Sequence, residues 1–191
     1  MQHILSELIW IPIISGILVL AVGSDQRPQL SRWLTLLTVL LTLGMCIPLL
    51  RAFDASTYAM QFTEDLPWMP AFGIRYSLGV DGLALLMIVL SVFTNLVVVL
   101  ATWSSIKKRV AQYFAAFLIM QGFLVGVFAA TDAILFYVFW EATLIPMYLI
   151  IGIWGSDNRV YAAIKFFLHY QNYLQLHQYF LGVPTQYLPP M

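Results

Sequence analysis

A single carboxylic acid, Glu141, lies near the middle of a long apolar segment, residues 132–155. The segment is long enough to cross a bilayer, and a helical rise of about 1.5 Å per residue places Glu141 about 13.5 Å from its start. This depth is close to the midplane of a hydrocarbon core that is about 30 Å thick. Acids are rare at this depth and usually functional, because an unpaired charge there is costly. We expect Glu141 to carry a proton; the alternative is that it only pairs with a cation on a neighbouring helix.

The neighbours of Glu141 favour a polar pathway over a lipid-facing surface. On a helix, residues three, four and seven positions away share one face, so Tyr137 and Tyr148 are predicted to lie one and two turns from the acid. Pro146 has no N–H, so the carbonyl of Ala142 loses its helical partner and a kink is expected. A free carbonyl beside a buried acid can hold water or a proton carrier.

The composition indicates a membrane protein. The chain has 191 residues, of which 61% are hydrophobic and 9% charged, too apolar for an ordinary soluble domain. The predicted fold class is therefore all-α, a polytopic bundle of transmembrane helices. The chain has no net charge and no basic patch outside the loops, so we expect no nucleic acid partner. A single cysteine, Cys46, offers no disulfide and no metal-binding set.

Five complete spans and an interrupted sixth are predicted. The first lacks the positive start of a signal peptide and is interpreted as an uncleaved helix, and residues 51–79 form a loop that is too polar to span. A sixth apolar run opens at Val160, but polar residues interrupt it from His169. We expect residues 1–168 to be transmembrane helices and residues 169–191 to be an atypical tail that arises from truncation or a frameshift. The five spans are Ile4–Val22, 30–50, 82–103, 112–130 and 132–155.

Other polar and small residues within the spans are interpreted mainly as structural. Asp81 is predicted to cap the third helix and is a weaker candidate for a proton carrier. Asn95 is expected to hydrogen-bond to another helix. Gly122 and Gly126 form a G-x-x-x-G pattern, which predicts close helix packing.

Near the sixth run, Lys165 has two interpretations. It is either a cytoplasmic anchor that extends its amine to the interface or a part of the proton input path. His169 and His177 are two candidate metal ligands only, so we expect no metal site.

The loop charges predict an orientation. Lys107, Lys108 and Arg109 lie in one loop, whereas residues 51–79 carry three acids, Asp54, Glu64 and Asp65. The positive-inside rule then places the first, third and fifth loops in the cytoplasm. The N-terminus and residues 51–79 are expected outside.

Three segments resemble a known family. YSLGVDGLALLMIVL, residues 76–90, is similar to the L-G-x-D-G segment of the antiporter-like subunits of respiratory complex I. FYVFWEATLIPMYLIIGIWG, residues 136–155, resembles the fifth helix of one member of that family. RVYAAIKFFL, residues 159–168, resembles the segment that opens the sixth helix of the same member.

The resemblance implies a membrane-arm subunit of a proton-translocating NADH-quinone oxidoreductase. In that family the glutamate of the fifth helix transfers protons, and it matches Glu141; its partner lysine on a later helix falls outside the matched segments. The resemblance implies no cofactor on this chain, with NADH, flavin, iron–sulfur clusters and quinone held by partner subunits. The expected partners are the other membrane-arm subunits and the lipid bilayer. The expected location is the bacterial inner membrane, or alternatively the mitochondrial inner membrane.

Two alternatives stay open at the level of the sequence. Subunits of multi-component cation/proton antiporters share the L-G-x-D-G segment and the mid-membrane glutamate. A non-functional truncated fragment is the other alternative. In each case redox chemistry belongs to partners, because the chain has no C-x-x-C cluster site and no G-x-G-x-x-G segment.

Overall fold

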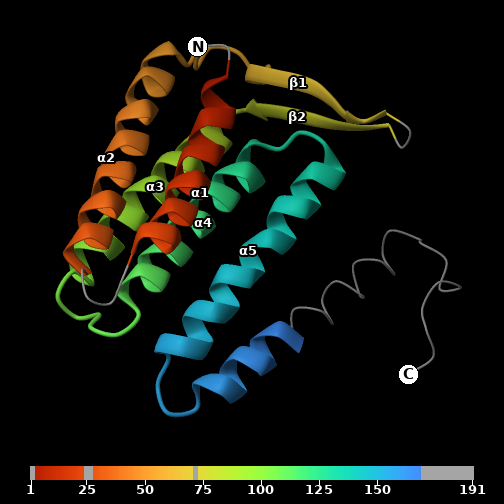
Figure 1. Cartoon of the computed structure of the whole chain (residues 1–191). Coiled ribbons are helices and arrows are strands. Elements are labelled where there is room, and N and C mark those ends of the chain that lie inside the picture. The colour runs from red at the N-terminus through yellow and green to blue at the C-terminus, as the bar shows by residue number, and fades with distance from the viewer. Residues whose placement is uncertain (1–2, 24–27, 71–72, 169–191) are drawn as a thin grey trace, which may run out of the picture. The chain divides into compact units, whose positions relative to one another are not determined.

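The computed structural model describes residues 3–23, 28–70 and 73–168 (Figure 1). Within these described residues, five helices are long and apolar enough to cross a membrane, which confirms the predicted helical fold class. The predicted atypical tail, residues 169–191, lies outside the described residues together with both of its histidines. The helices are α1 (Ile4–Val22), α2 (Pro28–Ala52), α3 (Gly82–Ala101), α4 (Val110–Ala129) and α5 (Ala133–Trp154).

Four helix ends differ from the sequence prediction by two residues each: both ends of α2, the end of α3 and the start of α4. Helix α2 begins at Pro28 rather than at residue 30. A proline suits the first turn because the N–H that it lacks would have no helical partner there. Helix α3 ends at Ala101 rather than at residue 103, and Thr102 closes it by donating its N–H and its hydroxyl to the carbonyl of Val98.

The chain divides into two compact units, Met1–Pro146 and Met147–Met191. In the first unit, α4 packs against α1, α2 and α3, and it is the most buried of the five helices (Figure 1). A Cβ atom on Gly122 would lie 2.5 Å from the backbone oxygen of Ile9, and one on Gly126 would lie 2.6 Å from the ring of Phe139. Both glycines therefore allow close packing, as the G-x-x-x-G pattern predicts.

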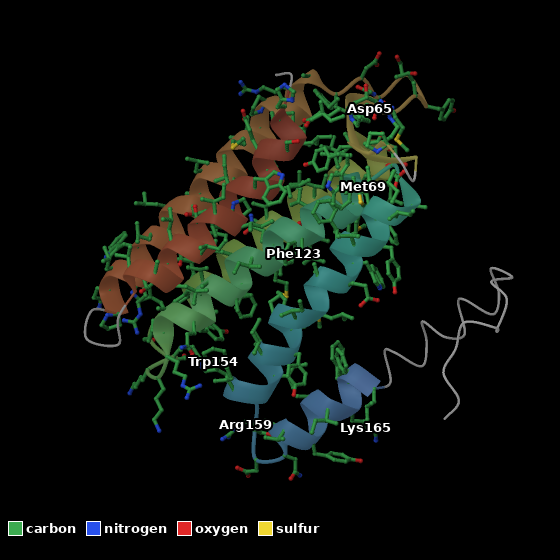
Figure 2. All side chains as sticks on the ribbon, turned by 45° about the vertical axis from the view of Figure 1, so that its right-hand side comes forward. Asp65, Met69, Phe123, Trp154, Arg159 and Lys165 are labelled. Atoms are coloured by element: carbon green, nitrogen blue, oxygen red, sulfur yellow. The ribbon has the colours of Figure 1, made fainter. Side chains whose placement is uncertain are left out.

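Residues 51–79, interpreted from the sequence as a loop, contain a β-hairpin. Strands β1 (Gln61–Met69) and β2 (Ile74–Val80) pair in antiparallel register. Gly73 at the turn has a φ of 67°, a left-handed conformation that favours glycine. Asp65 and Met69 both lie on this hairpin (Figure 2). The sequence signal is weak because β1 carries Pro67 and exposes most of its side chains.

The hairpin holds the ends of two helices by hydrogen bonds that span long stretches of sequence. The backbone N–H groups of Leu5 and Ser6, at the start of α1, donate to Oε1 of Glu64 on β1 over 2.9 and 3.3 Å. The hydroxyl of Ser6 donates to Oε2 of the same carboxylate. Before α5, the N–H of Thr131 donates to the carbonyl of Ser77 on β2 over 3.0 Å. The start of α1 and the turn before α5 are thus fixed to one small sheet.

The described part of the second unit is the end of α5 and a further helical segment, residues 159–168. The N–H of Arg159 donates to the carbonyl of Ser156 at the turn between them. The rings of Tyr148 and Phe167 meet edge to face, with their centroids 6.0 Å apart. The sixth apolar run therefore begins as a helix.

Candidate functional site

Glu141 lies on α5 within the first unit, with its side chain half-buried. One carboxyl oxygen, Oε1, is shielded from solvent and has no hydrogen-bond partner among the described residues. A buried acceptor without a donor costs about 1–3 kcal/mol, and a charged group costs more.

Tyr137 is the predicted neighbour that the structure brings to the acid. Its phenol interacts with the Glu141 carboxyl one turn further along α5. Tyr148 falls in the second unit, where its ring packs on Phe167. Its predicted position two turns from Glu141 therefore stays a prediction.

Helix α5 continues through Pro146, whose side chain is buried. The hydroxyl of Thr143 donates to the carbonyl of Phe139 over 3.1 Å, so this hydroxyl is used within its own helix. The sequence did not single out Thr143. The unpaired carbonyl of Ala142 stays a prediction.

Asp81 is a helix cap, as predicted. Its Oδ1 accepts the backbone N–H of Ala84 over 2.7 Å at the start of α3. Asp132 does the same for α5, where it accepts the N–H groups of Ile134 and Leu135 over 2.9 Å each. Both carboxylates thus satisfy backbone donors that a helix leaves unpaired at its start.

Lys165 lies in the helical segment 159–168, with Arg159 at its beginning (Figure 2). Its amine is 5.7 Å from the centre of the Tyr161 ring. This cation–π distance is compatible with an interfacial anchor. A role for Lys165 in a proton input path stays a prediction.

A polar network crosses three helices of the first unit. The side-chain amide of Asn95 on α3 donates to Gln121 Oε1 on α4, which confirms that Asn95 bonds to another helix. Gln121 Nε2 donates to the hydroxyl oxygen of Thr42 on α2 over 3.0 Å, and that hydroxyl donates to the carbonyl of Val39. The sequence analysis missed Gln121, and its signal is an amide in the middle of an apolar run.

No group of three or more metal-ligating side chains gathers within residues 3–23, 28–70 and 73–168. Cys46 is buried and has no disulfide. The candidate site is therefore the carboxyl of Glu141 with its tyrosine neighbour.

The fold is that of a multi-pass membrane protein with an acid in the middle of one candidate span. Residues 130–172, which include Glu141, match a family model described as NADH:quinone oxidoreductase/Mrp antiporter, TM. The chain is 39% identical to NADH-quinone oxidoreductase subunit M of Rickettsia typhi over 87% of its own length and 35% of the relative. It is also 39% identical to NADH-ubiquinone oxidoreductase chain 4 of Arabidopsis thaliana, over 86% of this chain and 33% of the relative.

A solved structure agrees with these relatives. One chain of respiratory complex I from Thermus thermophilus with bound NADH superposes with a TM-score of 0.72 and 27% identity, over 86% of this chain and 32% of that chain. The chain is a homologue of subunit M of NADH-quinone oxidoreductases, the subunit called chain 4 in the plant relative. It spans about a third of the length of these relatives.

Proposed function

We propose that this chain acts in the membrane arm of an NADH-quinone oxidoreductase, where Glu141 carries protons during translocation coupled to quinone reduction. The observation that carries the proposal is the shielded and unpartnered Oε1 of Glu141. It lies on a spanning helix, within the segment that matches the antiporter-like family. The reaction in this proposal is taken from the names of the relatives. The group that would take up and release a proton is the carboxyl of Glu141.

The proposed mechanism needs a cation from outside the described residues. Within residues 3–23, 28–70 and 73–168, an ion pair joins Arg75 to Asp65, and Nδ1 of His3 lies 3.9 Å from Oε2 of Glu64; neither contact includes Glu141. A cation that approaches Glu141 stabilises its ionised form. When the cation withdraws, desolvation favours the neutral form and the carboxyl takes up a proton. Tyr137 is placed to orient the carboxyl or pass a proton to it.

The names of the relatives and the charges of the loops support the remaining parts of the proposal. The partners are the other membrane-arm subunits, and these partners hold NADH, flavin, iron–sulfur clusters and quinone. The chain lies in the bacterial inner membrane with its N-terminus outside; a mitochondrial inner membrane is the alternative. Asp81 remains a cap in this scheme, because its Oδ1 accepts the N–H of Ala84.

A second candidate function is a subunit of a multi-component cation/proton antiporter. The description of the matching family model includes the Mrp antiporter, which favours this candidate. The neighbouring genes distinguish the two: quinone reductase genes on both sides support the oxidoreductase.

The substitution Glu141→Gln tests the proton carrier in the assembled complex. It keeps the shape and one acceptor oxygen but removes the titrating proton, so assembly survives and coupled quinone reduction falls at least about tenfold. Glu141→Asp keeps the acid with a shorter reach and retains part of the activity. The measurement is quinone reductase activity in membranes, normalised to assembled complex on a native gel.

Glu64→Gln is the matched control, because Glu64 is a buried carboxylate that lies outside the spans. It is expected to change the amount of complex and not the activity per assembled complex. A Glu141→Gln variant that assembles and works like the wild type would show that Glu141 is only structural. Loss of assembly in that variant would favour the ion-pair alternative, since removal of one partner leaves the other charge buried and unpaired.

A further inference from the structure

Two tryptophans meet at the end of the helices that carries the basic loop. Trp33 in the second turn of α2 and Trp103 just after α3 lie edge to face, with their ring centroids 5.4 Å apart. Helix α3 has 20 residues. At about 1.5 Å per residue its end lies about 30 Å from Gly82, which is one thickness of a hydrocarbon core. Indole rings are enriched at this depth. The pair therefore marks one membrane–water boundary.

A cation on α2 holds the basic loop beside this pair. The guanidinium of Arg32, the residue before Trp33, donates from Nη2 to the carbonyl of Ile106 over 3.0 Å. Lys107 follows Ile106 directly, so its backbone is fixed next to that guanidinium, and its side chain is exposed. Arg109 is exposed two residues further on. The fold thus gathers positive charges from α2 and from the loop at the boundary.

The helices around these charges supply no counter-charge. Residues 28–53 and 82–131, which include α2, α3, the loop and α4, contain no Asp or Glu. Within the part of the chain that the structure describes, neither Arg32 nor Lys107 forms an ion pair with a carboxylate. Nε of Arg32 is shielded from solvent, so water compensates this charge only in part. Like charges held close together repel, and an anion that binds beside them offsets the repulsion.

Apolar side chains continue from the tryptophans toward the middle of the membrane. Leu37 lies one turn from Trp33 on the same face of α2, and Leu100 lies one turn before Trp103 on α3. The two leucines are 62% and 55% exposed. This surface is positive outside the boundary, aromatic at the boundary and apolar below it. A phospholipid has the matching order of headgroup, glycerol and acyl chains.

We propose that Arg32, Lys107 and the Trp33–Trp103 pair bind an anionic phospholipid of the adjacent leaflet. The two cations attract its phosphodiester, the indoles pack against the glycerol region, and the acyl chains run along the exposed leucines of α2 and α3. The charges favour a headgroup with a net negative charge over a zwitterionic one. A lipid fits better than a soluble anion because the apolar surface continues from the charges into the span. This inference rests neither on Glu141 nor on the proposed reaction.

Lipid titration of the purified chain tests the selectivity. Native mass spectrometry in a non-ionic detergent counts the bound lipids as dioleoyl phosphatidylglycerol or dioleoyl phosphatidylcholine is added. The acyl chains are identical, so any difference in affinity comes from the headgroup. We expect the first phosphatidylglycerol to bind at least about fivefold more tightly than the first phosphatidylcholine, because one cation near a membrane surface contributes about that factor.

Removal of single charges locates the site. Lys107→Gln and Arg32→Gln are each expected to weaken phosphatidylglycerol binding by about fivefold and to leave phosphatidylcholine binding unchanged. Arg51→Gln is the matched control, because it removes the same charge from the opposite end of α2, where Arg51 is exposed. It should leave both affinities unchanged. Arg32→Gln also removes the bond to Ile106, whereas Lys107→Gln changes an exposed side chain and tests the charge alone.

Two further arms separate a lipid from other ligands. Trp33→Ala removes an apolar contact and should weaken the binding of both lipids, whereas Trp68→Ala, at an exposed position on the hairpin, should weaken neither. Inorganic phosphate in large excess should not displace phosphatidylglycerol. Four results would overturn the proposal: equal affinities for the two lipids, a loss in Lys107→Gln no larger than in Arg51→Gln, unchanged binding in Trp33→Ala, or displacement by phosphate, which would indicate a soluble anion.

Discussion

Glu64 caps a helix that lies 58 residues before it in the sequence. The residue at the N-cap of α1, His3, makes no side-chain cap hydrogen bond. Glu64 instead accepts the N–H groups of Leu5 and Ser6, the second and third residues of the helix. A carboxylate at this place also interacts favourably with the helix dipole. One side chain thereby couples the hairpin to the first span.

Glu64→Ala is expected to lower the free energy of unfolding by about 1–3 kcal/mol, because two backbone N–H groups and the Ser6 hydroxyl lose their acceptor. Glu7→Ala is the matched control, since Glu7 lies in the same first turn and is exposed. It should change stability by no more than about 0.5 kcal/mol. Thermal unfolding of the purified chain in detergent measures both. Equal shifts in the two variants would contradict the capping role.

A second charge on the hairpin predicts a pH dependence. The Arg75 guanidinium donates to both carboxyl oxygens of Asp65 over 2.7 and 2.8 Å and lowers the pKa of that carboxyl. Because the pKa is lowered in the folded state, the pair stabilises the hairpin above the ordinary aspartate pKa of about 3.9. This contribution is lost as the pH falls through the lowered pKa. Both groups are exposed, so the effect is small and decreases with salt.

The melting temperature of Asp65→Asn tests this dependence. The variant should melt slightly below the wild type at about pH 6, and the difference should shrink as the pH falls through the lowered pKa of Asp65. Raising the salt concentration at pH 6 should reduce the difference. A difference that stays constant across this pH range would exclude the Asp65 charge as its cause.

At the scale of elements, the sequence predicts the spans well because lipid offers the backbone no hydrogen-bond partners. A run of about twenty apolar residues must satisfy its own N–H and C=O groups, so it forms a helix. The caps Asp81 and Asp132 and the G-x-x-x-G pattern of Gly122 and Gly126 are local features too. The hairpin depends instead on partners far away, such as Thr131 for Ser77. No local pattern specifies such a pair, and the short, half-polar strands resemble a loop.

The candidate site and the polar network likewise contain features that the sequence of one helix predicts and features that it cannot predict. The depth of Glu141 and its neighbour Tyr137 follow from helical spacing, and the structure places them together. The link from Asn95 through Gln121 to Thr42 needs three helices to be in register. Sequence spacing within one helix cannot supply that register. The amide of Asn95 therefore indicated a partner without identifying it.

Gly122, in the G-x-x-x-G pattern of helix α4, gives a prediction about the packing of that helix. In Gly122→Ala, the added Cβ would meet the Ile9 backbone oxygen at 2.5 Å, and the backbone cannot yield cheaply. We expect a loss of about 1–3 kcal/mol from separation of α1 and α4. Gly44→Ala is the control, because a Cβ there meets nothing within 4 Å and alanine favours a helix more than glycine. Unfolding of both variants in detergent should show destabilisation at residue 122 only.

At the scale of the molecule, the first unit separates its charges between its two ends. The hairpin and the starts of α1, α3 and α5 lie at one end of the helices (Figure 1). Asp81 and Asp132 cap the last two of these starts. The loop between α3 and α4 lies at the other end and carries Lys107, Lys108 and Arg109. The positive-inside rule therefore gives the same orientation for the folded unit as for the sequence. The hairpin is expected on the outer side.

Single cysteines test this orientation, because the two ends offer exposed serines. Ser56 lies before the hairpin and Ser105 in the basic loop, and both are exposed. Each is changed to cysteine in a Cys46→Ala background, since Cys46 is the only native thiol. A membrane-impermeant thiol reagent added to intact cells should label position 56 and leave position 105 unlabelled. Permeabilised cells are the control and should label both. Labelling of position 105 without position 56 in intact cells would contradict this orientation. It would show that the hairpin lies in the cytoplasm and that the basic loop does not set the topology.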